Sequence, residues 1–525
     1  MTEKPLGTLL ADLGCTLTKE VQEALARVTV RGLALDSRGE DLAGALFLAR
    51  RGAKIHGLWF APEAFRRGAA AVLYDPEGAP RVHIASPPPL RWDRDTVYLP
   101  GPSGPLVSLP GLDARLGEIA RRFYGETTRD LALTAVTGTN GKTTVAWLLA
   151  RAWRALIPGQ ETAYLGTVGV DRGEGGLVPL ERTTPDVIAM HKWCARLHDK
   201  NVRRLVCEAS SHALVQGRLD GLRVQSAVFT NLSPEHLDYH ASLEAYREAK
   251  WRLFARSELR GAAVNVGDEC GRLFAARLAG GPRPFVLVRF TTGAEEAEFR
   301  AENVVAEAEG TRFDLLGPRG ERRRLRSGLL GLFNVENLLA VAASLHAEGV
   351  EWDRIAAVLP GLTPPPGRLE FVRPRRGPTV VVDFAHTPAA LAAVLDVCRR
   401  LTRGRLFLVF GCGGERDRGK RPIMGKLAAA HAGRIILTDD NPRGEDPGAI
   451  AAEILAGMPP GDPRVSVVHD RGQAIARALE EARAGDLVLV AGKGHEDTQV
   501  YGEEAQPFSD LAVVRACLSE GDLPC

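Results

Sequence analysis

The chain has 525 residues, of which 45% are hydrophobic and 25% charged, and its 67 basic residues nearly balance its 65 acidic ones. A net charge of +2 gives no basic stripe for nucleic acid, and no run approaches the roughly 18 apolar residues of a membrane span. The N-terminus lacks the pattern of a signal peptide, and the eight scattered cysteines form no CxxC pair. We therefore expect a globular cytoplasmic protein with reduced thiols.

The length favours about three domains, and the composition suggests where they meet. Two proline-rich stretches, 86–110 and 364–367, are typical of loops or linkers because proline interrupts helices and strands. We expect an N-terminal domain over residues 1–112, a central domain over 113–363 and a C-terminal domain over 364–525.

Short apolar runs alternate with helical patterns through the central and C-terminal segments. After Lys142, for example, Val145, Leu148, Leu149 and Ala152 recur at helical spacing. Buried strands are predicted at 131–136, 205–207, 227–229, 380–382, 406–410, 435–437 and 487–490. This alternation predicts parallel α/β units, whose ligands bind beyond the carboxyl ends of the strands.

A phosphate-binding loop is predicted between the first of these strands and the helix that follows. The run GTNGKTT (138–144) places two glycines where the backbone must turn tightly, so that several N–H groups can converge on a phosphate at a helix N-terminus. Lys142 can neutralise phosphate charge and Thr143 can ligate Mg²⁺. The loop predicts ATP or GTP binding, but a motor, a kinase, a switch and a ligase would all need it.

Three further segments carry polar residues at or near strand ends. Glu208 ends a predicted strand and is followed by ASSH; His236 lies in FTNLSPEHLDYH (229–240); Lys250 lies on a predicted helix over 243–254. Taken singly, each has a plain structural explanation, as a surface carboxylate, a capping histidine or a solvated helix face.

Taken together and in order, these segments resemble the Mur ligase family. The resemblance continues through GLFNVEN (331–337), GRLE (367–370), DFAHTP (383–388), GCGGERDRGKRP (411–422), DNPR (440–443) and GKGHE (492–496). It is strongest from about residue 113 onwards. It implies an α/β fold with an N-terminal uridine-binding domain, a central parallel-sheet domain like that of P-loop ATPases and a C-terminal Rossmann-like domain.

The resemblance also implies ATP and Mg²⁺ as cofactors and assigns residues to them. The implied catalytic residues are Lys142, Glu208, His236 and Lys250. The implied metal ligands are Thr143, Glu208, His236 and Lys250, the last as a carbamate, since an amine is a poor ligand for Mg²⁺. The implied ATP-binding residues are Gly138, Thr139, Asn140, Gly141, Lys142, Thr143, Thr144, Asn334, Asn337, Arg368, Asp383 and His386.

Within the family, the motifs match the members that add the third residue of the peptidoglycan stem peptide to UDP-MurNAc-L-Ala-D-Glu. The residues implied to bind that substrate are Leu35, Ser37, Thr183, Thr184, Ser210, Gln216 and Arg218. Arginine and hydroxyl donors suit its anionic groups. The N-terminal segment departs from the family pattern at His56-Gly57, where Asp-Gly is usual.

The DNPR run bears on which amino acid is added. An arginine at its last position accompanies the use of meso-diaminopimelate in the family, and Arg443 with Arg416 could bind the distal carboxylate that lysine lacks. Glu496 could accept from the distal ammonium. The implied acceptor site comprises Arg416, Asp440, Asn441, Pro442, Arg443, Gly492 and Glu496. L-lysine or L-ornithine stays open as the alternative acceptor.

The resemblance implies a reaction through an acyl phosphate, catalysed mainly by positioning and charge stabilisation, in the synthesis that underlies cell-wall growth, cell shape and division. It implies a monomer with no nucleic-acid or membrane partner. Two other interpretations are a folylpolyglutamate synthetase, against which the DNPR and GKGHE runs speak, and a Mur-like scaffold without catalysis, against which the retained lysines, glutamate and histidine speak.

Overall fold

The computed structural model of the protein describes residues 3–13, 19–38, 42–52, 55–85, 96–100, 104–173, 176–281, 285–307, 310–374 and 377–520. The chain divides into two compact units. The first comprises Met1–Leu133, Thr184–Leu205 and His212–Val224; the second comprises Thr134–Thr183, Val206–Ser211 and Gln225–Cys525. Within the described residues, no helix is both long enough and apolar enough to cross a membrane.

The first unit is built on a parallel sheet of four strands in the order β3-β4-β5-β8. Every residue of β4 is buried, because alternate side chains enter hydrophobic clusters on opposite faces of the sheet. The strands are β3 (Gly32–Ala34), β4 (Ala45–Ala49), β5 (Ala71–Tyr74) and β8 (Leu106–Ser108). The helices are α1 (Leu6–Leu10), α2 (Lys19–Ala26), α3 (Ala61–Arg66), α4 (Leu112–Tyr124) and α6 (Val187–Asp199), with the 3₁₀ turns η1 (Gly57–Phe60) and η2 (Thr127–Arg129).

Two small two-stranded sheets complete this unit: β1 (Lys4–Pro5) with β2 (Thr29–Val30), and β6 (Arg81–Ala85) with β7 (Thr96–Pro100). The loop predicted over 86–110 is wrong where β7 and β8 form, because parallel pairing with β6 and β5 overrides the local proline content. Residues 86–95 and 101–103 of that prediction lie outside the described residues.

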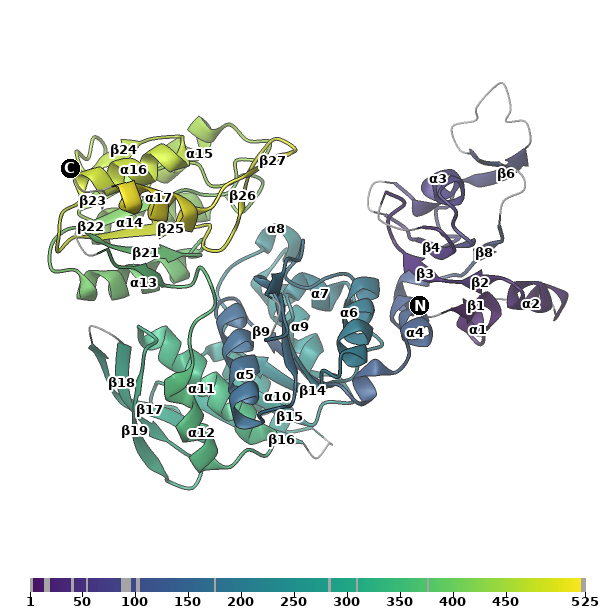
Figure 1. The fold of residues 1–525 in the computed structure, drawn as a ribbon, viewed down its shortest axis with the longest axis horizontal. Coiled ribbons are helices and arrows are strands. Elements are labelled where there is room, and N and C mark those ends of the chain that lie inside the picture. Colours follow the sequence, from purple (N-terminus) through teal and green to yellow (C-terminus); the bar gives the residue numbers. More distant parts are fainter. Residues whose placement is uncertain are drawn as a thin grey trace. The chain divides into compact units, whose positions relative to one another are not determined.

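The second unit contains a sheet of eleven strands in the order β12-β11-β10-β13-β9-β14-β15-β16-β17-β18-β19 (Figure 1). From β14 to β17 its neighbours are parallel, whereas both ends of the sheet are antiparallel. The strands are β9 (Ala132–Thr137), β10 (Thr162–Gly166), β11 (Gly169–Asp171), β12 (Leu177–Val178), β13 (Arg204–Glu208), β14 (Val224–Phe229), β15 (Gly261–Asn265), β16 (Val286–Thr291), β17 (Phe299–Glu307), β18 (Gly310–Leu316) and β19 (Arg322–Ser327).

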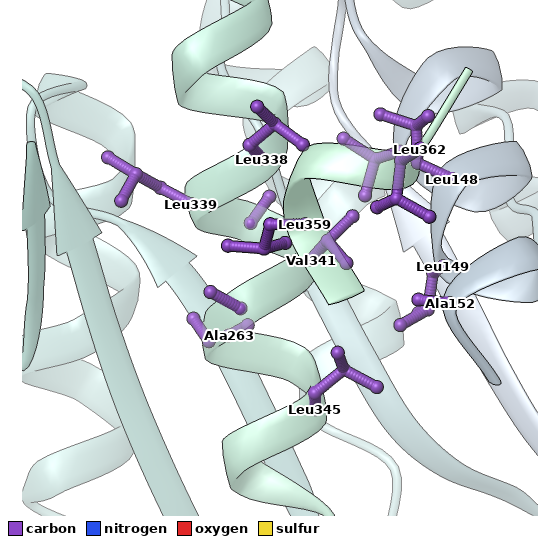
Figure 2. Packing of buried hydrophobic residues seen from close by; sticks show 14 of the residues in the cluster. Leu148, Leu149, Ala152, Ala263, Leu338, Leu339, Val341, Leu345, Leu359 and Leu362 are labelled. Carbon is purple, nitrogen blue, oxygen red and sulfur yellow. The ribbon is translucent and has the colours of Figure 1, made fainter. Parts of the chain in front are cut away.

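Helix α11 (Leu332–Ala347) contributes eight buried residues, Val335, 338–343 and Leu345, to a hydrophobic cluster that includes residues of this sheet. Figure 2 shows Leu338, Leu339, Val341 and Leu345 of α11 among side chains of α5 (Lys142–Leu156), β15 and the residues around 359–362. A helix that is apolar around most of its circumference is stable only when other elements cover it. The other helices of this unit are α8 (Leu237–His240), α9 (Leu243–Phe254), α10 (Glu269–Ala279), α12 (Trp352–Val358) and the 3₁₀ turn η3 (Leu359–Gly361), whereas α7 (Ser211–Val215) lies almost wholly in the first unit.

The C-terminal part of the second unit has its own sheet of six strands in the order β20-β21-β25-β22-β23-β24. All neighbours are parallel except the edge strand β20. Hydrophobic clusters cover both faces, one with α13 to α15 and the other with α16 and α17. The strands are β20 (Glu370–Val372), β21 (Thr379–Asp383), β22 (Leu406–Phe410), β23 (Arg434–Leu437), β24 (Val465–Val467) and β25 (Leu487–Ala491).

The helices of this part are α13 (Pro388–Leu401), α14 (Lys420–His431), α15 (Pro447–Leu455), α16 (Arg471–Glu481) and α17 (Asp510–Glu520), and a hairpin is formed by β26 (Thr498–Tyr501) and β27 (Glu504–Pro507). One ion pair is completely buried here: Arg471 of α16 donates to Asp510 of α17 through two nitrogens, at 2.7 and 2.8 Å, and both side chains are 0% exposed. Arg471 also donates to the carbonyl oxygen of Ala491, the last residue of β25, and to that of Asp439, which follows β23.

All seven predicted strands and the predicted helices at 142 and 243–254 are confirmed. The α/β class is confirmed as well. The antiparallel ends of the large sheet were not predicted, because β17 and β19 alternate buried and exposed residues rather than forming apolar runs. The domain boundaries at 112 and 363 stay predictions.

Replacing Leu345 by Ala should reduce the free energy of unfolding by about 2–5 kcal/mol, because a fully buried leucine is removed and a cavity is left. Leu332→Ala in the same helix should cost under about 1 kcal/mol, since Leu332 is 52% exposed. Denaturant unfolding followed by circular dichroism measures both. Equal losses in the two variants would contradict the packing described for α11.

The first unit contains a histidine that should make the protein sensitive to acid. His191 of α6 is 1% exposed, its Nε2 lies 2.9 Å from the Asp220 carbonyl oxygen, and burial lowers its pKa to about 4. An unfolded histidine titrates near 6.5, so the unfolded state binds more protons as the pH falls, and the free energy of unfolding declines between about pH 6.5 and 4.

In wild type this contribution amounts to about 2 kcal/mol between pH 7 and pH 5. His191→Gln, which can still donate to Asp220 but cannot titrate, should lose that part of the acid dependence. Unfolding midpoints at the two pH values measure the difference, and His198→Gln, at a more exposed histidine of α6, is the matched control. An unchanged pH slope in His191→Gln would contradict the assignment.

Candidate active site

The predicted phosphate loop lies between β9 and α5. Gly138 and Gly141 have φ angles of 153° and 84°, which side chains rarely adopt. A Cβ on Gly138 would lie 1.8 Å from the Thr230 hydroxyl oxygen, so β14 passes too close for any residue but glycine. Asn140 N donates to the Asn231 side chain and Thr230 Oγ1 donates to the Asn140 carbonyl oxygen, which ties the loop to the end of β14.

Lys142, the first residue of α5, folds back onto this loop. Its Nζ donates to the carbonyl oxygens of Gly138 at 3.0 Å and Thr139 at 2.8 Å. Burial lowers the pKa of Lys142, although the carboxylates of Glu235 and Glu208 oppose that shift. The ammonium group therefore lies at the loop where the sequence predicted it.

The next residue, Thr143, contacts Glu208 at the end of β13. Its hydroxyl donates to Glu208 Oε2 at 2.9 Å. Glu208 is 0% exposed and also accepts from the Tyr164 hydroxyl at 2.6 Å and from both the backbone N and the hydroxyl of Thr167. A buried carboxylate needs such donors to remain charged. Tyr164, whose pKa is raised by burial and by Glu208, was not identified from the sequence.

Lys250 of α9 is 1% exposed. Its Nζ donates to the Gly138 carbonyl oxygen at 2.7 Å and lies 4.2 Å from the centre of the Tyr246 ring. Burial, and then the nearby charge of Lys142, hold the pKa of Lys250 far below its usual value. Burial therefore favours the uncharged amine, which is the form that reacts as a nucleophile.

Glu235 was not predicted, yet it connects two predicted histidines. Its carboxylate lies 3.8 Å from His236 Nε2 and 3.4 Å from His386 Nε2. Burial would raise the pKa of Glu235, but the hydrogen bond from His386 and the charges of His386, His236 and Lys142 outweigh burial and lower it. His236 has a left-handed backbone, with φ of 57°, which directs the chain from this turn into α8.

The predicted metal ligands are thus only partly in contact with one another. Thr143 and Glu208 touch, and their oxygens are the hard donors that Mg²⁺ prefers. His236 pairs with Glu235, and Lys250 presents an amine to the loop. Over the described ranges, no three His, Cys, Asp or Glu side chains form a cluster able to hold a metal ion by themselves. The residues fit a cation that takes further ligands from bound substrates or water.

A cavity of about 350 Å³ adjoins the loop. Seven predicted ATP-binding residues line it: Asn140, Gly141, Thr144, Asn334, Asn337, Arg368 and Asp383. Asn337 donates to Asn334, and Asn334 donates to the Leu330 carbonyl oxygen, so both amides have fixed orientations. The cavity also has an apolar wall, formed by Phe333, Leu369, Ala389, Ala390, Ala393 and Val394, that the motifs did not predict.

Two of the seven predicted lining residues, Arg368 and Asp383, come from the C-terminal part of the unit and are held in place there. Arg368 lies with its guanidinium 4.5 Å from the centre of the Phe384 ring and donates to Thr143 Oγ1 at 3.2 Å. Asp383 accepts from the backbone N of Leu369 and of Ala385, and burial raises its pKa. The other predicted ATP-binding residues, Gly138, Thr139, Lys142, Thr143 and His386, are not among the lining residues of this cavity.

A second cavity, of about 200 Å³, gathers six of the seven predicted acceptor residues: Arg416, Asp440, Asn441, Arg443, Gly492 and Glu496. His236, Glu235 and His386 line it as well. Burial and the neighbouring charge of Arg416 lower the pKa of Arg443. Two guanidinium groups and the carboxylates of Glu235, Asp417, Asp440 and Glu496 thus line one small cavity, which suits a ligand that carries charges of both signs.

Arg443 is oriented by its own backbone and by the loop opposite. Its φ is 52°, its N donates to the Val500 carbonyl oxygen at 3.0 Å, and its Nη1 donates to the Gly414 carbonyl oxygen at 2.8 Å. Pro442, the remaining predicted acceptor residue, is buried beside it and does not line the cavity.

The residues predicted to bind the nucleotide-sugar substrate belong to both compact units. In the first unit, Arg218 donates to the Thr184 carbonyl oxygen at 2.6 Å and through two nitrogens to the Gln216 side chain. Ser37 is buried and Leu35 half-buried. In the second unit, Thr183 accepts a hydrogen bond from Thr167, and Ser210 follows β13.

The departure from the family pattern at His56 has a structural explanation. His56 is 7% exposed; its Nδ1 accepts from Leu58 N, which caps η1, and its Nε2 lies 2.9 Å from the Asp75 carbonyl oxygen. The His56 ring therefore caps η1, as an aspartate carboxylate can do at the N-terminus of a helix.

Comparisons with known proteins show the family to which the chain belongs. The model of the Mur ligase family, catalytic domain, matches residues 29–124; that of the Mur ligase middle domain matches 136–345; that of the Mur ligase, glutamate ligase domain, matches 367–494. The chain is 44% identical over 495 residues to the UDP-N-acetylmuramoyl-L-alanyl-D-glutamate–2,6-diaminopimelate ligase of Alkalilimnicola ehrlichii, covering 94% of this chain and 95% of that protein.

The enzyme of the same name from Pseudomonas putida is 43% identical over 514 residues, 97% of this chain and 99% of its own length. A solved structure with that name is 34% identical, has a TM-score of 0.62 and covers 94% of this chain and 96% of its own. MurF from Acinetobacter baumannii, at 16% identity and a TM-score of 0.63 over 99% of both chains, shares the fold.

Proposed function

The chain belongs to the Mur ligase family, and on that premise we propose that it is the ATP-dependent ligase that adds meso-2,6-diaminopimelate to UDP-MurNAc-L-Ala-D-Glu. The new amide bond joins the acceptor amine to the γ-carboxylate of D-glutamate. The reaction extends the peptidoglycan stem peptide and takes place in the cytoplasm.

The second cavity is the observation that carries the choice of acceptor. Arg416 and Arg443 provide the paired donors that a distal carboxylate requires, and Glu496 and Asp440 provide acceptors for an ammonium group. Lysine has no distal carboxylate, so it would leave the half-buried guanidinium of Arg443 without a carboxylate partner, and such a site discriminates strongly. The relatives at 44% and 43% identity are named for diaminopimelate.

ATP occupies the first cavity in this proposal. Its base lies against the apolar wall near Asn334 and Asn337, and its phosphates extend to the loop at 138–144. Lys142 then turns from the loop carbonyls to the phosphates, and Arg368 and His386 approach the same charge. MurF of Thermotoga maritima, which has the same fold, was solved in complex with ADP.

Mg²⁺ supplies charge neutralisation where two anions, a carboxylate and a phosphoryl group, must meet. Thr143 and Glu208 would hold it, with His236 and a carbamate on Lys250 as the further ligands. The lowered pKa of Lys250 supports the carbamate, because only an unprotonated amine can add to CO₂. The same depressed pKa explains why this lysine can be buried beside Lys142.

The chemistry is two substitutions that the residues position. An oxygen of the D-glutamate γ-carboxylate bonds to the γ-phosphorus as the bond to ADP breaks; the acceptor amine then bonds to the acyl carbon, loses a proton, and phosphate leaves. Leu35, Ser37, Thr183, Thr184, Ser210, Gln216 and Arg218 hold the nucleotide-sugar substrate. Catalysis consists chiefly of alignment and electrostatic stabilisation.

Purified protein with ATP, Mg²⁺ and UDP-MurNAc-L-Ala-D-Glu should release phosphate when meso-diaminopimelate is added. L-lysine and L-ornithine should each give a kcat/KM at least about 100-fold lower, because neither brings a distal carboxylate to Arg443. Phosphate release in parallel assays measures the three acceptors. Turnover with lysine or ornithine alone would refute the acceptor assignment, and no turnover with any acceptor would refute the ligase.

Lys250→Ala should lower kcat by at least about 100-fold, because the anionic ligand that the carbamate provides is lost. Removing dissolved CO₂ should slow the wild type, and bicarbonate should restore it without restoring the variant. Lys200→Ala, at an exposed lysine after α6, is the matched control and should behave as wild type. Turnover near the wild-type rate in Lys250→Ala would refute the carbamate.

A further inference from the structure

Lys493 is a completely buried lysine beside the second cavity. It follows β25 and is 0% exposed, yet it is not among the residues that line the cavity. Its Nζ donates to Asn441 Oδ1 at 2.9 Å and to Glu496 Oε2 at 2.9 Å. A buried ammonium costs free energy unless it is paired and hydrogen-bonded, so these contacts are the reason that it can lie here.

The contacts of Lys493 fix the orientation of the Asn441 amide. Asn441 Oδ1 accepts from Lys493 and from Val500 N at 3.0 Å, and both of these groups can only donate. The opposite orientation would place the amide NH₂ against two donors. The NH₂ group therefore faces Glu496, where it donates to Oε2 at 3.0 Å.

Glu496 consequently has two different oxygens. Oε2 accepts from both Lys493 and Asn441. Oε1 accepts no hydrogen bond from any part of the chain that the structure describes, and Glu496 lines the cavity with Arg416 and Arg443. A carboxylate anchored through one oxygen presents the other in a fixed position, which is what selective recognition of a charged donor requires.

We propose that Lys493 is a positioning residue that makes the acceptor site selective for a second ammonium group, acting through Glu496 and Asn441. The inference rests on the proposed function, since it concerns how that acceptor is read. Lys493 balances the charge of Glu496 from behind and orders the Asn441 amide. The outward oxygen of Glu496 then receives the distal ammonium, while the arginines receive the distal carboxylate.

The test compares two acceptors that differ only in the distal amino group: meso-diaminopimelate and L-2-aminopimelate. In wild type the ratio of their kcat/KM values should be at least about 100, because the analogue brings no ammonium group to the outward oxygen of Glu496. In Lys493→Met, which keeps an unbranched side chain one atom shorter and without the charge, the ratio should fall below about 10. KM for ATP should stay within about twofold of wild type.

Glu496→Gln should reduce the same ratio, and Lys493→Met added to it should change the ratio by under about twofold, since the two residues act as a unit. Lys426→Met, at an exposed lysine of α14, should leave the ratio unchanged. If Lys493→Met does not fold, as judged by circular dichroism, Lys493→Gln carries the same comparison.

A purely structural lysine would lower kcat/KM for both acceptors alike, so an unchanged ratio in a folded Lys493 variant would overturn the proposal. A wild type that uses both acceptors equally would overturn it too. A wild type that releases no phosphate with meso-diaminopimelate would instead refute the proposed function, which keeps the two failures distinguishable.

Discussion

Two lysine side chains donate to one oxygen atom, the carbonyl oxygen of Gly138, and the candidate active site of the second unit is built around that atom. Lys142 reaches it from α5 and Lys250 from α9, at 3.0 and 2.7 Å. The carbonyl can take this position only because Gly138 has a φ of 153° and no side chain to collide with Thr230. A single backbone conformation thus brings together two lysine side chains whose pKa values burial lowers, at the edge where β9, β13 and β14 end.

Two cavities lie in this unit. One runs from the loop to an apolar wall that includes Phe333 of α11, and the other is lined by residues that follow β22, β23 and β25. Glu235 lines the second cavity, where its carboxylate contacts His236 and His386. The pKa of this carboxyl group is lowered by His386, His236 and Lys142 in spite of its burial.

Much of this could be predicted from the sequence, for reasons that individual residues make plain. The strands that end in Thr137, Glu208 and Phe229 are apolar runs buried on both faces, so they were predictable, and the polar residues after them had to lie at one edge. The loop at 138–144 and the acceptor residues were predicted because each lies in a short motif of consecutive residues.

What could not be predicted depends on contacts between distant residues. Tyr164 and Glu235 look like ordinary strand and loop residues until Glu208 and His386 are placed beside them. Strands β17 and β19 mix buried and exposed residues and carry several charged side chains, a pattern that does not predict the extension of the sheet. Lys493 lies inside a recognised motif, but only the geometry distinguishes a lysine that touches ligand from one that lies behind the residues that do.

The buried pair of Arg471 and Asp510 makes the acceptor cavity depend on the last helix of the described chain. Arg471 donates to the carbonyl oxygens of Asp439 and Ala491, which immediately precede Asp440 and Gly492 in the chain. Its charge is balanced by Asp510, the first residue of α17. A chain that ends before residue 510 would leave a guanidinium buried without a counter-ion under the cavity floor, at a cost of several kcal/mol. During synthesis on the ribosome, the C-terminal sheet therefore cannot reach its final form until Asp510 has emerged, so the second cavity is completed long after the phosphate loop has been made.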